Sequence, residues 1–133
     1  MIAKAEWQHE QIYRATSDSG HTVTMDGGAH TEGASPMEYV LMALCGCTSV
    51  DVVSILTKKR ERFTGLTVSA TAQKATQSPT VFTAIELVYR VTGSVNPKSM
   101  EDAVRLSKEK YCSVSAMLEK TAAITYTIEY ADA

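Results

Sequence analysis

The chain has 133 residues, of which 44% are hydrophobic and 21% are charged, a mix typical of a folded globular protein. Its formal net charge of −2 and the lack of a long Lys/Arg run give little electrostatic support for nucleic-acid binding. The length predicts a single domain over residues 1–133. The first residues lack the basic segment and apolar core of a signal peptide, so we expect a cytosolic protein with no membrane span.

The first third of the chain is patterned as short strands. Strands are expected at residues 2–8, 11–17 and 21–26, with a turn at residues 18–20. Residues 27–34 then form a glycine-rich loop. This loop lacks the Lys-Ser/Thr ending of a phosphate-binding loop, so we do not expect it to be one.

A long helix is expected to begin next. Ser35 suits the N-cap, Pro36 the first helical position, and Glu38 completes a capping box. The helix is expected to run to about Arg62, and apolar residues cover most of its circumference, which indicates a central, buried helix. One narrow stripe is polar and recurs at helical spacing: Cys47, Asp51, Ser54 and Lys58.

Beyond Gly65 the hydrophobic period changes from 3.6 to 2. Residues 66–72 and 85–92 are expected to form a hairpin with its loop near residues 77–79, and residues 124–130 form a last strand. The order β-β-β-α-β-β-α-α-β predicts an α+β fold with mainly antiparallel strands.

Two shorter helices are expected between the last two strands. Asn96 and Pro97 open the first, residues 111–113 interrupt it, and residues 114–120 form the second. The inward face of the first should carry Met100, Ala103, Val104 and Ser107.

Three cysteines in a reducing compartment do not form a disulfide framework. Cys47, in mid-helix, is either a buried small residue or a reactive thiol that needs a nearby cation, and Asp51 one turn away disfavours a thiolate. Cys45 is expected to be buried. Thiols two residues apart on a helix point about 200° apart, so we expect no metal site there.

Cys112 has two interpretations that the residues alone leave open. It lies where a short helix begins, so unpaired backbone N–H groups favour an anion, and Lys108 and Lys110 are near in sequence. It could equally be a buried residue at a helix junction.

Three segments carry a family resemblance: residues 35–39, 43–48 and 111–115. Together they resemble the OsmC/Ohr family of thiol-dependent hydroperoxide reductases, and look closest to its YhfA-like branch. The resemblance implies an OsmC-like, intertwined homodimer. Two long central helices would pack back to back, wrapped by mainly antiparallel sheets of both subunits, with each active site at the interface.

The resemblance also implies the chemistry. The peroxidatic cysteine of the family falls on Cys47 and the resolving cysteine on Cys112. The Cys47 thiolate would attack a small organic hydroperoxide and become a sulfenic acid, and Cys112 would condense with it to a disulfide that an external dithiol reduces. No metal and no other cofactor is implied.

The sequence departs from the peroxidase pattern at two positions. The family arginine has no counterpart between residues 15 and 59, and Met37 stands after Pro36 where the family has glutamate, with Glu38 one position away. Without a cation only a minor fraction of Cys47 would be thiolate at neutral pH, so the activity would be weak. The alternatives are a non-enzymatic dimer of the same fold that binds a small apolar ligand, and cysteines that only pack a core.

Overall fold

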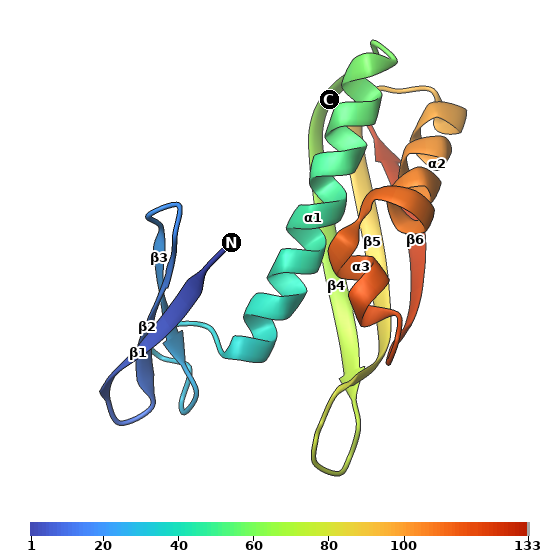
Figure 1. Cartoon of the computed structure of the whole chain (residues 1–133). Helices are drawn as coiled ribbons and strands as arrows, with labels where there is room; N and C mark the ends of the chain where they lie inside the picture. The colour runs from blue at the N-terminus through green and yellow to red at the C-terminus, as the bar shows by residue number, and fades with distance from the viewer. Residues whose placement is uncertain (133) are drawn as a thin grey trace. The chain divides into compact units, whose positions relative to one another are not determined.

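A computed structural model describes residues 1–132 (Figure 1). The elements in chain order are β1 (Ala3–His9), β2 (Ile12–Ser17), β3 (Thr22–Asp26), α1 (Pro36–Lys58), β4 (Arg62–Lys74), β5 (Phe82–Ser94), α2 (Pro97–Leu106), the π-helical turn η1 (Ser107–Tyr111), α3 (Ser113–Leu118) and β6 (Ala123–Ala131). This order confirms the α+β class expected from the sequence. The expected helix end at Arg62 is wrong, because α1 stops at Lys58.

The chain divides into two compact units, Met1–Met42 and Ala43–Ala133, so the boundary falls inside α1. The expectation of a single domain over residues 1–133 stays a prediction. In the first unit, β1, β2 and β3 form an antiparallel sheet in chain order. Within residues 1–42 only Ile12 and Asp26 are buried, so this sheet has almost no core of its own.

Asp26 orders the glycine-rich loop. Its carboxylate accepts N–H groups from Gly28 at 2.8 Å, Thr31 at 3.0 Å and Glu32 at 3.3 Å. The Gly28 amide, with others in the loop, lowers the pKa of Asp26. The amides that could hold an external anion therefore already bind a carboxylate of the chain.

The start of α1 follows its capping signal. The Glu38 N–H donates to Ser35 Oγ at 3.2 Å, and the Ser35 N–H donates to a Glu38 carboxylate oxygen at 2.8 Å. This reciprocal pair confirms the predicted capping box. Within the same unit Tyr39 OH donates to the Thr24 carbonyl at 2.8 Å, which ties the first turn of α1 to β3.

The second unit is a three-stranded sheet with helices over one face (Figure 1). β4 and β5 form the expected antiparallel hairpin, whereas β6 pairs with β5 in parallel, with Ile85 opposite Ile124. The parallel pair follows from the helical crossover that joins β5 to β6. Alternate β5 side chains are buried under the helices: Ile85, Leu87, Tyr89 and Val91.

α2 begins as predicted, with Asn96 Oδ1 accepting the Lys98 N–H at 2.9 Å. Its inward face is also confirmed, because Met100, Ala103, Val104 and Ser107 are all 0% exposed. The interruption predicted at residues 111–113 is the end of the π-helical turn η1, and such turns often mark functional sites.

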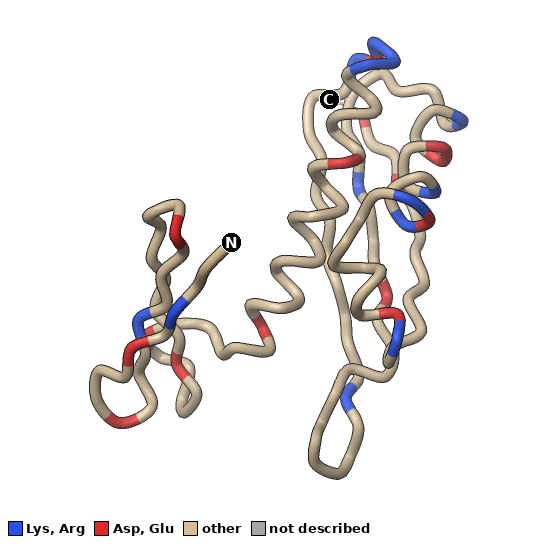
Figure 2. The backbone as a smooth tube through the Cα atoms, in the orientation of Figure 1, with Lys and Arg blue, Asp and Glu red and all other residues tan. Residues whose placement is uncertain are grey.

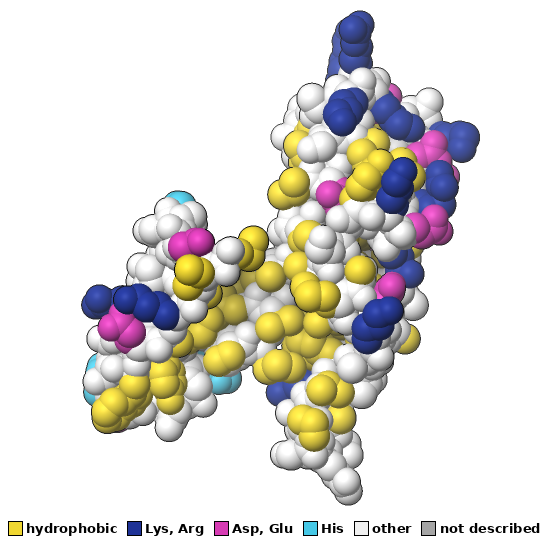
Figure 3. Space-filling model, viewed as in Figure 1, with side chains coloured by type: hydrophobic (Ala, Val, Ile, Leu, Met, Phe, Trp, Pro, Cys, Tyr) yellow, Lys and Arg dark blue, Asp and Glu magenta, His cyan; other side chains and the backbone are white. Residues whose placement is uncertain are grey.

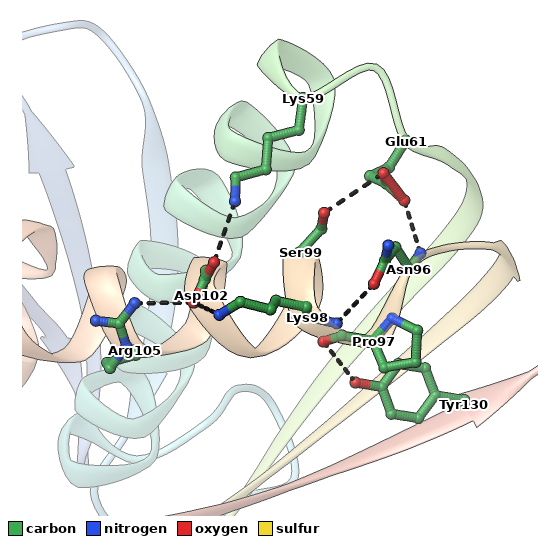
Figure 4. A network of polar contacts seen from close by, with 9 residues as sticks. All are labelled: Lys59, Glu61, Asn96, Pro97, Lys98, Ser99, Asp102, Arg105 and Tyr130. Atoms are coloured by element: carbon green, nitrogen blue, oxygen red, sulfur yellow. Dashed lines mark hydrogen bonds and ion pairs between the residues drawn. The ribbon is translucent and has the colours of Figure 1, made fainter.

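A polar network fixes α2 against its neighbours in the second unit (Figure 4). Asp102 accepts from Arg105 at 2.9 Å and pairs at 3.4 Å with Lys59, which directly follows α1. Glu61 accepts the Asn96 N–H at 2.6 Å. These contacts set the position of α2 along α1, and therefore the position of the turn that follows α2.

Within one chain α1 is buried along a single stripe, Leu44, Thr48, Val52 and Leu56. Val50 and Val53 are 66% and 38% exposed. All-round burial, expected from the sequence, is therefore not reached in one chain. By length and composition alone α1 could also cross a membrane, but core helices of soluble proteins pass the same test.

Candidate functional site

The second unit brings two cysteines together from distant parts of the chain. Cys47 lies in the middle of α1, and Cys112 is the N-cap of α3. A side-chain hydrogen bond and the charge of Cys47 are among the causes that raise the pKa of Cys112, so the two thiols are within interaction range. Cys47 is partly exposed and Cys112 is 2% exposed.

Burial controls the ionisation of Cys112. Desolvation raises the pKa of this thiol from 9.0 to about 11, and Cys47 and Asp51 add to the rise. The Ser115 N–H, which donates to Cys112 Sγ at 3.4 Å, acts in the opposite direction. The structure thus supports the interpretation of Cys112 as a buried residue at a helix junction. The start of α3 favours the thiolate, but the loss of water around the thiol outweighs that effect.

Cys45 differs from the expectation. It is partly exposed, so the prediction of a simply buried residue is wrong. The sequence argument assumed a helix surrounded on all sides, whereas one chain covers only one stripe of α1. The pKa of Cys45 is still raised by desolvation.

A chain of buried hydroxyl groups lies beside the thiol pair. Ser107 Oγ donates to Asp51 Oδ2 at 2.7 Å, Thr48 Oγ1 lies 2.8 Å from Ser107 Oγ, and Tyr89 OH lies 2.7 Å from Thr48 Oγ1. Each hydroxyl has one hydrogen. Because Ser107 gives its hydrogen to the carboxylate, Thr48 must donate to Ser107, and Tyr89 must donate to Thr48.

The two ends of this series of hydrogen bonds, Asp51 and Tyr89, both interact electrostatically with Cys112. The charge of Asp51 raises the pKa of Cys112. Desolvation raises the pKa of Tyr89 to about 12, and the charge of Cys112 contributes to that shift. Sequence reasoning identified Asp51 and the inward Ser107 but missed Thr48, which links them to Tyr89. The sequence feature that could have identified Thr48 is its place as a polar residue on an otherwise apolar face of α1.

The polar stripe of α1 forms one wall of a shallow groove of about 360 Å³. Its lining residues are Asp51, Ser54, Ile55, Lys58, Lys59, Leu106 and Tyr111. Asp51 is the only charged residue of α1 between Glu38 and Lys58, and Figure 2 shows that most of this helix carries no charged residue. The predicted alignment of Asp51, Ser54 and Lys58 is confirmed, although Cys47 does not line the groove.

A negative charge acts on Cys112. The carboxylate of Asp51 is among the groups that raise the pKa of this thiol. Within residues 1–132 no group of three or more His, Cys, Asp or Glu side chains is placed to hold a metal ion. The groups that the structure brings together here are thiols, hydroxyls and a carboxylate.

Comparisons with known proteins agree with this architecture. The family model for OsmC-like protein matches residues 27–127. Protein YhfA of Escherichia coli (strain K12) is 42% identical over 130 residues, covering 97% of each chain. A hypothetical protein from Aquifex aeolicus VF5 is 30% identical, with a TM-score of 0.84 over 97% of this chain and 96% of that one.

An organic hydroperoxide resistance protein OsmC from Legionella pneumophila shares the fold, with a TM-score of 0.72 and 14% identity over 96% of this chain and 95% of that one. These neighbours define the class, an α+β fold of the OsmC type. The chain belongs to the OsmC/Ohr family, with the similarity to YhfA that the sequence motifs predicted.

Proposed function

We propose that the protein is a thiol-dependent hydroperoxide reductase in which Cys47 attacks the peroxide and Cys112 resolves the product. The observation that carries the proposal is the interaction of Cys112 with Cys47 across two separate helices. Family membership supports it, since structural neighbours include organic hydroperoxide resistance proteins.

The proposed cycle is balanced in atoms and electrons. Cys47 sulfur bonds to the terminal peroxide oxygen, the O–O bond breaks, and the alkoxide takes the thiol proton to leave as an alcohol. Cys112 sulfur then attacks the Cys47 sulfenic acid, forming the disulfide and releasing water. An external dithiol reduces the disulfide by exchange.

The rate of the first step should be low compared with that of an activated thiol. A thiolate is favoured by a nearby cation, but the sequence has no arginine between residues 15 and 59, where the peroxidase pattern places one. We therefore expect a slow or substrate-restricted peroxidase.

We further propose that the protein works as a homodimer. Large apolar side chains are exposed in one chain: Val50, Val53, Tyr111 and Met117 are 66%, 38%, 50% and 66% exposed. Figure 3 shows such side chains gathered on the surface of the chain. An exposed apolar surface of this kind is typical of an interface, and a second copy would cover the otherwise exposed face of α1.

The test mixes the fully reduced protein with a slight excess of cumene hydroperoxide and follows intact mass and peptide maps over time. The expected product is a Cys47–Cys112 disulfide. Cys47→Ser should abolish peroxide-dependent oxidation, whereas Cys45→Ser is the matched control and should react like the unchanged protein. An unchanged rate in Cys47→Ser would refute the proposal.

A second candidate, a non-enzymatic dimer that binds a small ligand, is favoured by the groove beside Asp51 and by the lack of an arginine between residues 15 and 59. Ile55, Leu106 and Tyr111 give the groove an apolar wall. Mass spectrometry of the native protein would detect a co-purifying molecule. An empty protein that turns over hydroperoxide would exclude this candidate.

A further inference from the structure

One buried hydroxyl group near the thiol pair makes no hydrogen bond within the described residues. Ser115 is 2% exposed, and within the described residues 1–132 its Oγ has no hydrogen-bond partner. Leaving a buried hydroxyl unpaired costs free energy, so native structures contain few of them. The other buried hydroxyls of this site, those of Thr48, Tyr89 and Ser107, are all bonded.

The backbone places Ser115 next to the resolving sulfur. Cys112 is the N-cap of α3, Ser115 is three residues later, and the Ser115 N–H donates to Cys112 Sγ at 3.4 Å. The Cα–Cβ bonds of a helix tilt toward its N-terminus, so the Ser115 Cβ lies on the Cys112 side of its own Cα. Cys112 in turn interacts with Cys47.

We propose that Ser115 Oγ donates a hydrogen bond to the oxygen that leaves Cys47 when the disulfide forms. The inference rests on the proposed function and concerns its second step. As Cys112 sulfur bonds to Cys47 sulfur, the S–O bond breaks and its electron pair goes to oxygen. The departing hydroxide takes the Cys112 thiol proton and becomes water, and Ser115 keeps its own proton throughout.

This role explains why the hydroxyl is unpaired in the reduced protein. The oxygen that it binds exists only after Cys47 has reacted with peroxide. A donor held in place before charge develops stabilises a transition state without reorganisation, and removing one such donor lowers a rate about 100-fold.

The test is single-turnover oxidation of the full chain with one equivalent of cumene hydroperoxide, quenched with a sulfenic-acid trap at successive times. Ser115→Ala should form the Cys47 sulfenic acid at the normal rate and close the disulfide about 100-fold more slowly. Ser113→Ala, which alters an exposed serine of the same helix, is the matched control and should close normally.

Stability separates this role from a structural one. Ser115→Ala removes an unpaired hydroxyl, so its urea midpoint should equal or exceed that of the unchanged protein. Ser115→Thr, which keeps the hydroxyl, should restore closure at least in part. Closure of Ser115→Ala within twofold of normal, or slow closure together with a lower midpoint and no rescue by threonine, would overturn the inference.

Failure of the proposed function has a different signature. If the unchanged protein never forms a sulfenic acid at Cys47, the first step is absent and both proposals fall. If the sulfenic acid forms and Ser115→Ala closes normally, only the role of Ser115 is refuted.

Discussion

The direction of the hydrogen bonds that run from Tyr89 to Asp51 can be tested by removing a hydroxyl group at each end of this series. Ser107→Ala removes the donor to Asp51, a charge-assisted hydrogen bond worth about 1.5–3 kcal/mol. It also leaves the Thr48 hydrogen without an acceptor in a residue that is 2% exposed, a penalty of about 1–3 kcal/mol. Asp51 is partly exposed and water can replace part of its bond, so we expect a net loss of about 2–3 kcal/mol.

Tyr89→Phe should cost much less. The Tyr89 hydroxyl only donates in this series of hydrogen bonds. Without it Thr48 no longer accepts a hydrogen bond from Tyr89 but still donates its own to Ser107. We expect a loss of about 0.5–1.5 kcal/mol, the net worth of one ordinary hydrogen bond.

The assay is urea unfolding of the reduced protein at pH 7, at one fixed protein concentration because association would shift the midpoint. The free energy of unfolding should fall more in Ser107→Ala than in Tyr89→Phe. A loss in Tyr89→Phe equal to or larger than that in Ser107→Ala would refute the deduced direction of the hydrogen bonds.

Three further predictions concern pH and capping. Burial raises the pKa of Cys112 from an ordinary 9.0 to about 11, so between these pH values the folded state keeps a proton that the unfolded chain loses. The free energy of unfolding should therefore fall as pH rises from about 9 to about 11. The fall should be less steep in Cys112→Ala, which lacks the thiol. Urea unfolding at pH 8 and pH 10.5 measures this dependence. An equal drop in the free energy of unfolding between these pH values in Cys112→Ala and in the unchanged protein would contradict the prediction. The Arg105 hydrogen bond lowers the pKa of Asp102, so this carboxylate stabilises the fold above its unfolded pKa of 3.8 and less as pH falls through its lowered folded value. The melting temperature of Asp102→Asn should therefore lie below normal at pH 7 and approach it at pH 2.5, whereas a constant deficit would argue against the ion pairs. Ser35→Ala removes the acceptor of the Glu38 N–H and should lower the free energy of unfolding by about 1 kcal/mol in urea, with no change if the cap is unimportant.

The elements that depend on local chemistry could be predicted from the sequence. The start of α1 follows from the Ser35 and Glu38 side chains, and the start of α2 follows from Asn96, because each cap bonds groups only two or three residues away. The parallel pairing of β6 could not be predicted in this way, since a period of 2 identifies a strand and not its partner.

The site was predictable only in part. The family motif identifies Cys47 and Cys112, but the ionisation of Cys112 depends on its burial and on Asp51, which the fold brings near it. Thr48 and Ser107 are 59 positions apart, so no local pattern predicts their bond. The error at Cys45 has a related cause, because the exposure of a helix face depends on what covers it.

Burial holds the candidate resolving thiol in its protonated form at rest. Desolvation is the largest cause that raises the pKa of Cys112 to about 11, and it persists after Cys47 has become a sulfenic acid. The proposed second step therefore uses the Cys112 thiol, whose proton leaves with the departing oxygen as water. The Ser115 N–H, which donates to Cys112 Sγ at 3.4 Å, favours the anion and so assists the loss of that proton as the sulfur–sulfur bond forms.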